Sequence, residues 1–173
     1  MHYNTIIVGA GASGLFASII AARNGKSVLL LEHSNKIGKK LLITGKGRCN
    51  VTNNSDSNEI LKNVPVNSRF MFSALNNFSS YDTMNFFEEL GVKLKTERGN
   101  RVFPESDSAA EIVDALENEV KKLKVHIKFC DVNELIIEDD TVKGVKTNNG
   151  DFFSDSVIIA TGGKSYPGTG STG

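Results

Sequence analysis

The sequence predicts an α/β fold: a Rossmann-like parallel sheet with an inserted helical segment and a small β-meander. Two observations support this class. Residues 3–32 read as strand, helix and strand around a glycine-rich turn, and the right-handed crossover of such a βαβ unit makes its two strands parallel. Late in the chain, "SVIIATGG" repeats the pattern of an apolar strand that ends in glycines. The 173 residues suffice for one domain with an apolar core.

The βαβ unit is predicted element by element. Residues 3–10, "YNTIIVGA", form a short apolar run rich in β-branched residues, which is typical of a buried strand. Residues 13–25 follow with Leu15, Ile19 and Ala22 at helical spacing, and Gly25 ends the helix. Residues 26–32, "KSVLLLE", are then a second buried strand that ends at Glu32.

The middle of the chain is predicted as an insertion. Residues 34–66 are polar and aperiodic, and a loop of that length inside a domain is usually functional. Helices are expected at 68–78 and 79–91, the second capped by Ser80 or Asp82, followed by a strand at 92–97. After another loop, a helix capped by Ser106 or Asp107 buries a stripe of apolar residues. The phenylalanines of this region are expected in the core: Phe70, Phe72, Phe78, Phe86 and Phe87.

The last part is predicted as a β-meander and a returning strand. The runs at 125–132, 133–140 and 141–149 read as three short strands with tight turns, with the meander placed at residues 131–155. The run at 151–163 reads as the returning strand. The chain then stops in a glycine-rich loop containing Tyr166 and Pro167, so we expect it to be the N-terminal part of a longer protein.

Composition restricts the partners. Twenty basic and twenty acidic residues give zero net charge, so there is no electrostatic footprint for nucleic acid or an anionic membrane. The apolar runs are too short to cross a bilayer, and the N-terminus lacks the features of a signal peptide. Two cysteines are too few for a disulfide framework, which indicates a reducing cytoplasm. The three histidines have no spacing suited to a metal site, so none is expected.

The chemistry-bearing motif is G-x-G-x-x-G at Gly9, Gly11 and Gly14. It follows a strand, opens a helix, and is followed by an acidic residue at the end of the next strand, which is the context of a dinucleotide-binding fingerprint. Gly9 permits the turn, Gly11 lets the backbone approach a pyrophosphate, and Gly14 allows close helix–strand packing. Glu32 would accept hydrogen bonds from a ribose and repel a 2′-phosphate, which disfavours NADP. The alternative is a glycine-rich turn without a ligand.

The order of elements separates FAD from NAD, because a simple NAD domain would continue with further βα units. Four segments, "GAGASGLFASIIAARNGKSVLLLE", "GKKLLITGKGRCNVTN", "RVFPESDSAAEIVDAL" and "VIIATGGKSYPGTGSTG", resemble the HI0933-like flavoprotein family, with its glutathione-reductase type of FAD fold. The resemblance runs through the whole chain. It implies FAD as the cofactor and a partial FAD-binding domain at residues 1–173, because family members are about twice as long.

The resemblance also implies positions for the cofactor site. The pyrophosphate would lie on Gly9, Ala10, Gly11, Ala12, Ser13 and Gly14, with Glu32 on the ribose and Val132 beside the adenine. After the returning strand, the chain would approach the nucleotide a second time, at Ala160, Thr161 and Gly162. Lys46 stands where the family leads us to expect a small residue.

Other residues are candidates through their own chemistry. Arg48 could bind a phosphate or a flavin carbonyl through two N–H groups. Lys40 could neutralise phosphate charge, Thr44 and Asn50 could bond the flavin ring, and His33 could border the adenosine. Gly45, Gly47 and Cys49 are also placed among the cofactor-binding residues of this loop. Cys49 is expected as a buried thiol rather than a redox group.

The sequence therefore predicts the FAD-binding portion of a flavin-dependent oxidoreductase that acts on an unidentified small-molecule substrate. Two alternatives remain open: a catalytically inactive nucleotide-binding fragment, and an NAD-dependent dehydrogenase domain. No residue is a convincing general acid or base. Self-association of the chain through an exposed sheet edge is also expected.

Overall fold

The computed structural model describes residues 2–165 and 167–169, so Tyr166 lies outside the described residues. The chain forms two compact units, Met1–Leu41 with Leu116–Gly173, and Leu42–Ala115. Each unit is described by itself.

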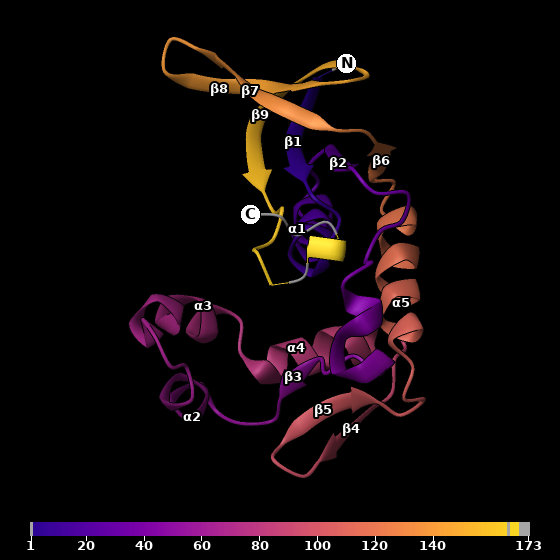
Figure 1. Ribbon diagram of the computed structural model, residues 1–173, viewed down its shortest axis with the longest axis vertical. Helices are drawn as coiled ribbons and strands as arrows, with labels where there is room; N and C mark the ends of the chain where they lie inside the picture. Colours follow the sequence, from indigo (N-terminus) through magenta and orange to yellow (C-terminus); the bar gives the residue numbers. More distant parts are fainter. Residues whose placement is uncertain (1, 166, 170–173) are drawn as a thin grey trace. The chain divides into compact units, whose positions relative to one another are not determined.

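The first unit is built on a six-stranded, mostly parallel sheet with the order β6-β2-β1-β9-β8-β7 (Figure 1). Strands β6, β2, β1 and β9 are parallel, and β8 and β7 are antiparallel additions. This arrangement confirms the predicted Rossmann-like α/β class. The strands are β1 (His2–Val8), β2 (Val28–Glu32), β6 (His126–Phe129), β7 (Val132–Glu138), β8 (Thr141–Thr147) and β9 (Gly150–Ile159).

The apolar runs of the βαβ unit lie in the core. All five residues of β2 are buried, and Ile6 and Ile7 of β1 have no exposed surface. Helix α1 (Ala12–Arg23) packs against β1 and β2 and buries Leu15 and Ile19. These strands need a continuous apolar run because both faces of a parallel sheet are covered.

The predicted meander is corrected at its first strand. Residues 126–129 form β6, which pairs in parallel with β2 and so belongs to the nucleotide-binding sheet. Strands β7, β8 and β9 follow as consecutive antiparallel neighbours. A four-residue strand after a helix carries the same short apolar signal in either setting, and only its pairing partner distinguishes them.

The second unit holds the inserted segment, with a three-stranded antiparallel sheet of order β3-β5-β4. Helix α5 (Ala109–Lys122) begins in this unit and ends in the first. The other elements are η1 (Leu41–Gly47), β3 (Thr52–Asn53), α2 (Ser57–Lys62), η2 (Ser68–Met71), α3 (Phe72–Asn77), α4 (Ser80–Glu89), β4 (Leu94–Glu97) and β5 (Arg101–Pro104).

Several local predictions in this unit are wrong. The polar stretch at 34–66 contains η1, β3 and α2, and β5 lies in a predicted loop. The cap of α4 is Ser79, whose side chain accepts from the Asp82 N–H in a capping box. Helix α5 begins at Ala109, after the predicted caps.

Of the five phenylalanines predicted in the core, two are buried, and Phe78 is partly buried. Phe86 and Phe87 are buried, but Phe70 and Phe72 are 85% and 54% exposed. Residues 68–71 form a 3-10 helix rather than the start of a longer α-helix, so the assumed helical face does not exist there. In the part of the chain that the structure describes, no helix has the length and apolarity needed to cross a membrane.

Candidate nucleotide-binding site

The glycine turn lies between the end of β1 and the start of α1. Gly9 has φ +101°, and a Cβ there would lie 2.6 Å from the carbonyl oxygen of Ala160. A side chain at this position would therefore be strained and would displace the chain that follows β9. The backbone of Ala160 is fixed in turn, because its N–H donates to the Val8 carbonyl at 2.8 Å.

The other two glycines of the motif differ in what surrounds them. A Cβ at Gly14 would overlap the carbonyl oxygen of Gly9, so this glycine allows α1 to approach the turn. A Cβ at Gly11 would meet no described atom within 4 Å. The chain's own packing therefore requires glycine at two of the three positions, and the third faces open space.

The N-terminus of α1 has the charge distribution of an anion-binding site. Gly11 is its N-cap, with no side-chain capping bond and no acidic residue in the first turn among the described residues. The first N–H groups of a helix lack intrahelical partners, and the helix dipole adds partial positive charge at this end. Ala12, Ser13 and Gly14 thus present donors that fit a phosphate group.

Glu32, at the end of β2, is 8% exposed and lies against the glycine turn. Its Oε2 accepts a hydrogen bond from the Ala10 N–H at 2.7 Å, and its Oε1 accepts one from the Ser34 N–H at 2.8 Å. The half-exposed His33 places Nδ1 3.2 Å from Oε1. The sequence analysis did not single out Ser34 as a partner of Glu32. The available signal was its position, two residues after the acidic residue of the fingerprint.

Lys40 and the residues after β9 also lie in the first unit. Lys40 donates from Nζ to the Ser165 hydroxyl at 2.6 Å, which links the segment after β2 to the segment after β9. Thr161 and Gly162 are exposed, and Gly162 has φ +79°. Val132 begins β7, pairs with Thr147 and packs against the core cluster of the sheet.

The remaining predicted residues lie in the second unit, in the loop from Thr44 to Asn50. Left-handed backbone recurs along it, with φ +55° at Gly45, +60° at Lys46, +84° at Gly47 and +56° at Cys49. Lys46, where a small residue was expected, adopts the conformation that favours glycine. A Cβ at Gly45 would lie 2.8 Å from the Asn50 nitrogen, so the loop is tightly folded.

Arg48 is engaged within its own unit. Its Nη2 donates to Glu97 at 2.5 Å, its Nε donates to Asp107 at 2.8 Å, and its guanidinium carbon lies 4.1 Å from the ring centre of Phe103. The hydrogen bond to Glu97 raises the pKa of Arg48, and Asp107 adds to this effect. The guanidinium is therefore held by two carboxylates and a ring face in the structure.

The other predicted site residues of the loop also contact protein groups. Cys49 is buried, and burial raises the pKa of its thiol, which disfavours the reactive thiolate. Asn50 donates from its side-chain amide to the carbonyls of Thr52 and Val102 at 2.9 and 3.0 Å. The Thr44 carbonyl accepts from the Cys49 N–H at 3.0 Å.

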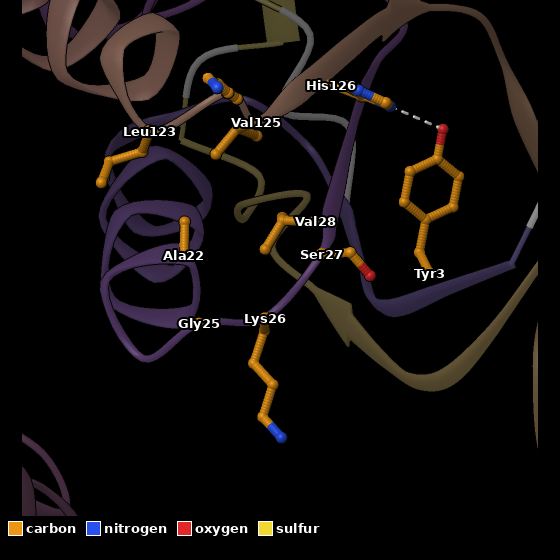
Figure 2. A pocket seen from close by; sticks show the side chains of 10 residues that line it. Tyr3, Ala22, Gly25, Lys26, Ser27, Val28, Leu123, Val125 and His126 are labelled. Atoms are coloured by element: carbon orange, nitrogen blue, oxygen red, sulfur yellow. Dashed lines mark hydrogen bonds between the residues drawn. The ribbon is translucent and has the colours of Figure 1, made fainter.

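A cavity of about 370 Å³ opens in the first unit, at the end of the parallel strands opposite the glycine turn. No predicted site residue lines it. Its walls come from the starts of β1, β2 and β6 and from the ends of α1 and α5, and Tyr3 hydrogen-bonds His126 there at 3.0 Å (Figure 2). Ligands of open α/β sheets bind at the carboxyl ends of the strands, so the glycine turn is the better candidate site.

The fold and the glycine turn define a dinucleotide-binding Rossmann domain. The chain belongs to the family described as HI0933-like protein Rossmann domain, whose model matches residues 3–173. The family prediction is thereby confirmed. The family and the fold support FAD as the cofactor.

Two relatives illustrate the similarity. The 3-dehydro-bile acid delta(4,6)-reductase of Clostridium scindens is 38% identical over an alignment of 172 positions, which covers 96% of this chain and 41% of the relative. The ribosomal RNA dihydrouridine synthase of Escherichia coli is 33% identical over 171 residues, 99% of this chain and 42% of the relative. The chain thus spans about two fifths of the length of these relatives.

Solved structures share the fold. A 3-ketosteroid-delta4-(5alpha)-dehydrogenase from Rhodococcus jostii superposes with a TM-score of 0.74 at 18% identity, over 95% of this chain and 47% of that one. A flavocytochrome c3 fumarate reductase superposes with a TM-score of 0.65 at 23% identity, over 94% and 34%. At these identities the similarity shows the fold alone.

Proposed function

We propose that this chain is the FAD-binding part of a flavin-dependent oxidoreductase. The observation that carries the proposal is the open N-terminus of α1 beside the buried carboxylate of Glu32, in a chain of the HI0933-like family. When bound, FAD supplies hydride or electron transfer. The chain's own residues bind the cofactor and orient it.

The roles within the first unit follow from the groups that each residue offers. The N–H groups of Ala12, Ser13 and Gly14 would donate to the pyrophosphate, with Gly11 leaving room for its approach. Glu32 would accept from a ribose hydroxyl, and Lys40 would supply a positive charge nearby. We also propose backbone contacts from Val132, Ala160, Thr161 and Gly162.

The loop from Thr44 to Asn50 would contribute backbone groups rather than charge. Arg48 is bound to Glu97 and Asp107, so a role as a phosphate clamp would require it to leave both carboxylates. Gly45 and Gly47 remain the candidates here, because left-handed backbone can turn N–H groups toward a ligand. Cys49 would fill space as a small buried side chain.

We propose a small molecule as the substrate and the cytoplasm as the location. The zero net charge supports a small molecule, because RNA-binding surfaces are usually basic. The name of the E. coli relative makes ribosomal RNA the competing substrate class. Self-association of the chain stays a prediction.

Absorbance spectroscopy tests the cofactor. The purified protein, mixed with FAD and passed through gel filtration, should retain the visible flavin bands. Protein that stays colourless would contradict the proposal and favour the inactive nucleotide-binding fragment. Thermal unfolding in the presence of FAD or NAD separates the dehydrogenase alternative, since the true ligand raises the unfolding temperature more at equal concentration.

Reoxidation kinetics test the substrate class. After chemical reduction of the flavin in the complete protein, a steroid enone and ribosomal RNA can be compared as acceptors under anaerobic conditions. Faster return of the oxidised spectrum with the enone would support a small-molecule substrate. Faster return with RNA would overturn it.

A further inference from the structure

The middle residue of the glycine turn, Ala10, is held through both of its backbone polar groups. Its N–H donates to Oε2 of Glu32 at 2.7 Å, and its carbonyl accepts from the Gly38 N–H at 2.8 Å. Its side chain has no exposed surface. Both partners come from one short segment, residues 32–38, which begins at the last residue of β2.

Glu32 is itself fixed by this segment. The Ser34 N–H and His33 Nδ1 both approach Oε1, at 2.8 and 3.2 Å, while Oε2 faces Ala10. A carboxylate offers about four lone-pair sites in all. Two backbone N–H groups bind two of these sites, and the His33 ring lies beside Oε1.

The shape of the segment is also determined by its sequence. The Ser34 hydroxyl donates to the Lys36 carbonyl at 2.8 Å and closes a tight turn. Ile37 is 4% exposed and anchors the segment in the core. Gly38 has φ +64°, the left-handed conformation that a β-branched residue rarely adopts.

We propose that residues 33–38, the clamp loop, hold the glycine turn in its nucleotide-binding shape, with Ser34 and Gly38 as positioning residues. The inference rests on the proposed function and extends the site beyond the fingerprint. Ser34 acts through Glu32, and Gly38 acts directly on the carbonyl of Ala10. These bonds tie the turn to protein groups, and a turn that the protein itself orders lowers the cost of ordering on binding.

Two pairs of variants test the clamp loop, with the dissociation constant for FAD measured by quenching of flavin fluorescence. Ser34→Pro removes the N–H that reaches Glu32, while Ser34→Ala keeps it and loses only the hydroxyl bond to Lys36. Gly38→Val strains the left-handed backbone, whereas Gly38→Asn tolerates it. The proline and valine variants should bind FAD about ten- to a hundredfold more weakly, as expected for a lost hydrogen bond to a charged or buried group.

The matched controls decide the outcome. Ser34→Ala and Gly38→Asn should bind FAD within about threefold of the unmodified protein, because the positioning bonds remain. If Ser34→Pro does not fold, the Gly38 pair gives the result alone. Equal affinity for FAD in both members of a folded pair would overturn the proposed role of the clamp loop, while the proposal of FAD binding would stand. Failure of the unmodified protein to bind FAD would overturn the proposed function as well.

Discussion

Gly14 lies so close to Gly9 that a Cβ on Gly14 would overlap the carbonyl oxygen of Gly9. The first turn of α1 therefore touches the backbone of the turn that precedes it. Gly11, three residues earlier, has no described atom within 4 Å of the same hypothetical Cβ. The two glycines are equivalent in the motif and opposite in their surroundings.

Alanine at these two positions should therefore have different effects. Gly14→Ala should lower the free energy of unfolding by at least about 2–3 kcal/mol, because backbone must move to admit the methyl group. Gly11→Ala should change the free energy of unfolding by no more than about 1 kcal/mol, because its methyl group would point into open space. The same methyl group should weaken FAD binding, because it would occupy the room proposed for the pyrophosphate. Urea unfolding and FAD titration of both variants give the comparison. Equal stability in the two variants would contradict the packing described here.

Glu32→Gln should weaken both the fold and cofactor binding. Both carboxylate oxygens accept from N–H groups, so an amide nitrogen in either place would face a donor. The expected cost is about 1–3 kcal/mol in the free energy of unfolding without FAD. Glu134→Gln, on exposed strand β7, is the matched control and should change neither quantity. A Glu32→Gln protein of unchanged stability would show that the bond to Ala10 is absent in solution.

Asp107 should make the stability of the second unit depend on pH. Hydrogen bonds from Lys95 and from Arg48 lower its pKa below the ordinary 3.8. A carboxyl group with a lowered folded-state pKa contributes stability above its unfolded pKa and loses that contribution as the pH falls. Asp107→Asn should therefore lower the urea midpoint at neutral pH, and the difference from the unmodified protein should shrink as the pH falls below the ordinary pKa of the carboxyl group.

Asp140→Asn is the control for this experiment. Asp140 is exposed in the β7–β8 turn with φ +57°, a conformation that asparagine also adopts. The urea midpoint of Asp140→Asn should equal that of the unmodified protein across the pH range. A constant difference between Asp107→Asn and the unmodified protein across the pH range would exclude an ionic contribution from Asp107.

Two phenylalanines of the second unit should respond oppositely to truncation. Phe86 is 5% exposed on α4, and Phe86→Ala should cost about 3–5 kcal/mol of unfolding free energy. Phe70 is 85% exposed on η2, and Phe70→Ala should change the free energy of unfolding by no more than about 0.5 kcal/mol. Chemical unfolding of each variant measures the difference. A large loss in Phe70→Ala would mean that this ring is buried in solution.

Much of the first unit could be predicted from its sequence because the signals are local. A buried parallel strand requires an unbroken apolar run, and the turn between β1 and α1 requires glycine for steric reasons. The family resemblance added the cofactor. The pairing of β6 with β2, in contrast, joins residues almost a hundred positions apart and carries no local signal.

The second unit was harder to predict because its elements are short. Strand β5 has four residues, among them an arginine and a proline, and acquires its structure by pairing with β3 and β4. Phe70 lies in a four-residue 3-10 helix rather than in the predicted α-helix, and its side chain is 85% exposed. Periodicity over so few residues does not distinguish these cases.

The sequence by itself determined the glycine turn, the acidic residue after the second strand and the family, because each depends on residue type at a fixed spacing. Only the tertiary structure decided the partners of the polar side chains. Arg48 lies on Glu97 and Asp107, and Glu32 reaches back to Ala10, because folding brings together groups that are distant along the chain. Hydrogen bonds depend on distance and angle, which spacing in the sequence does not fix.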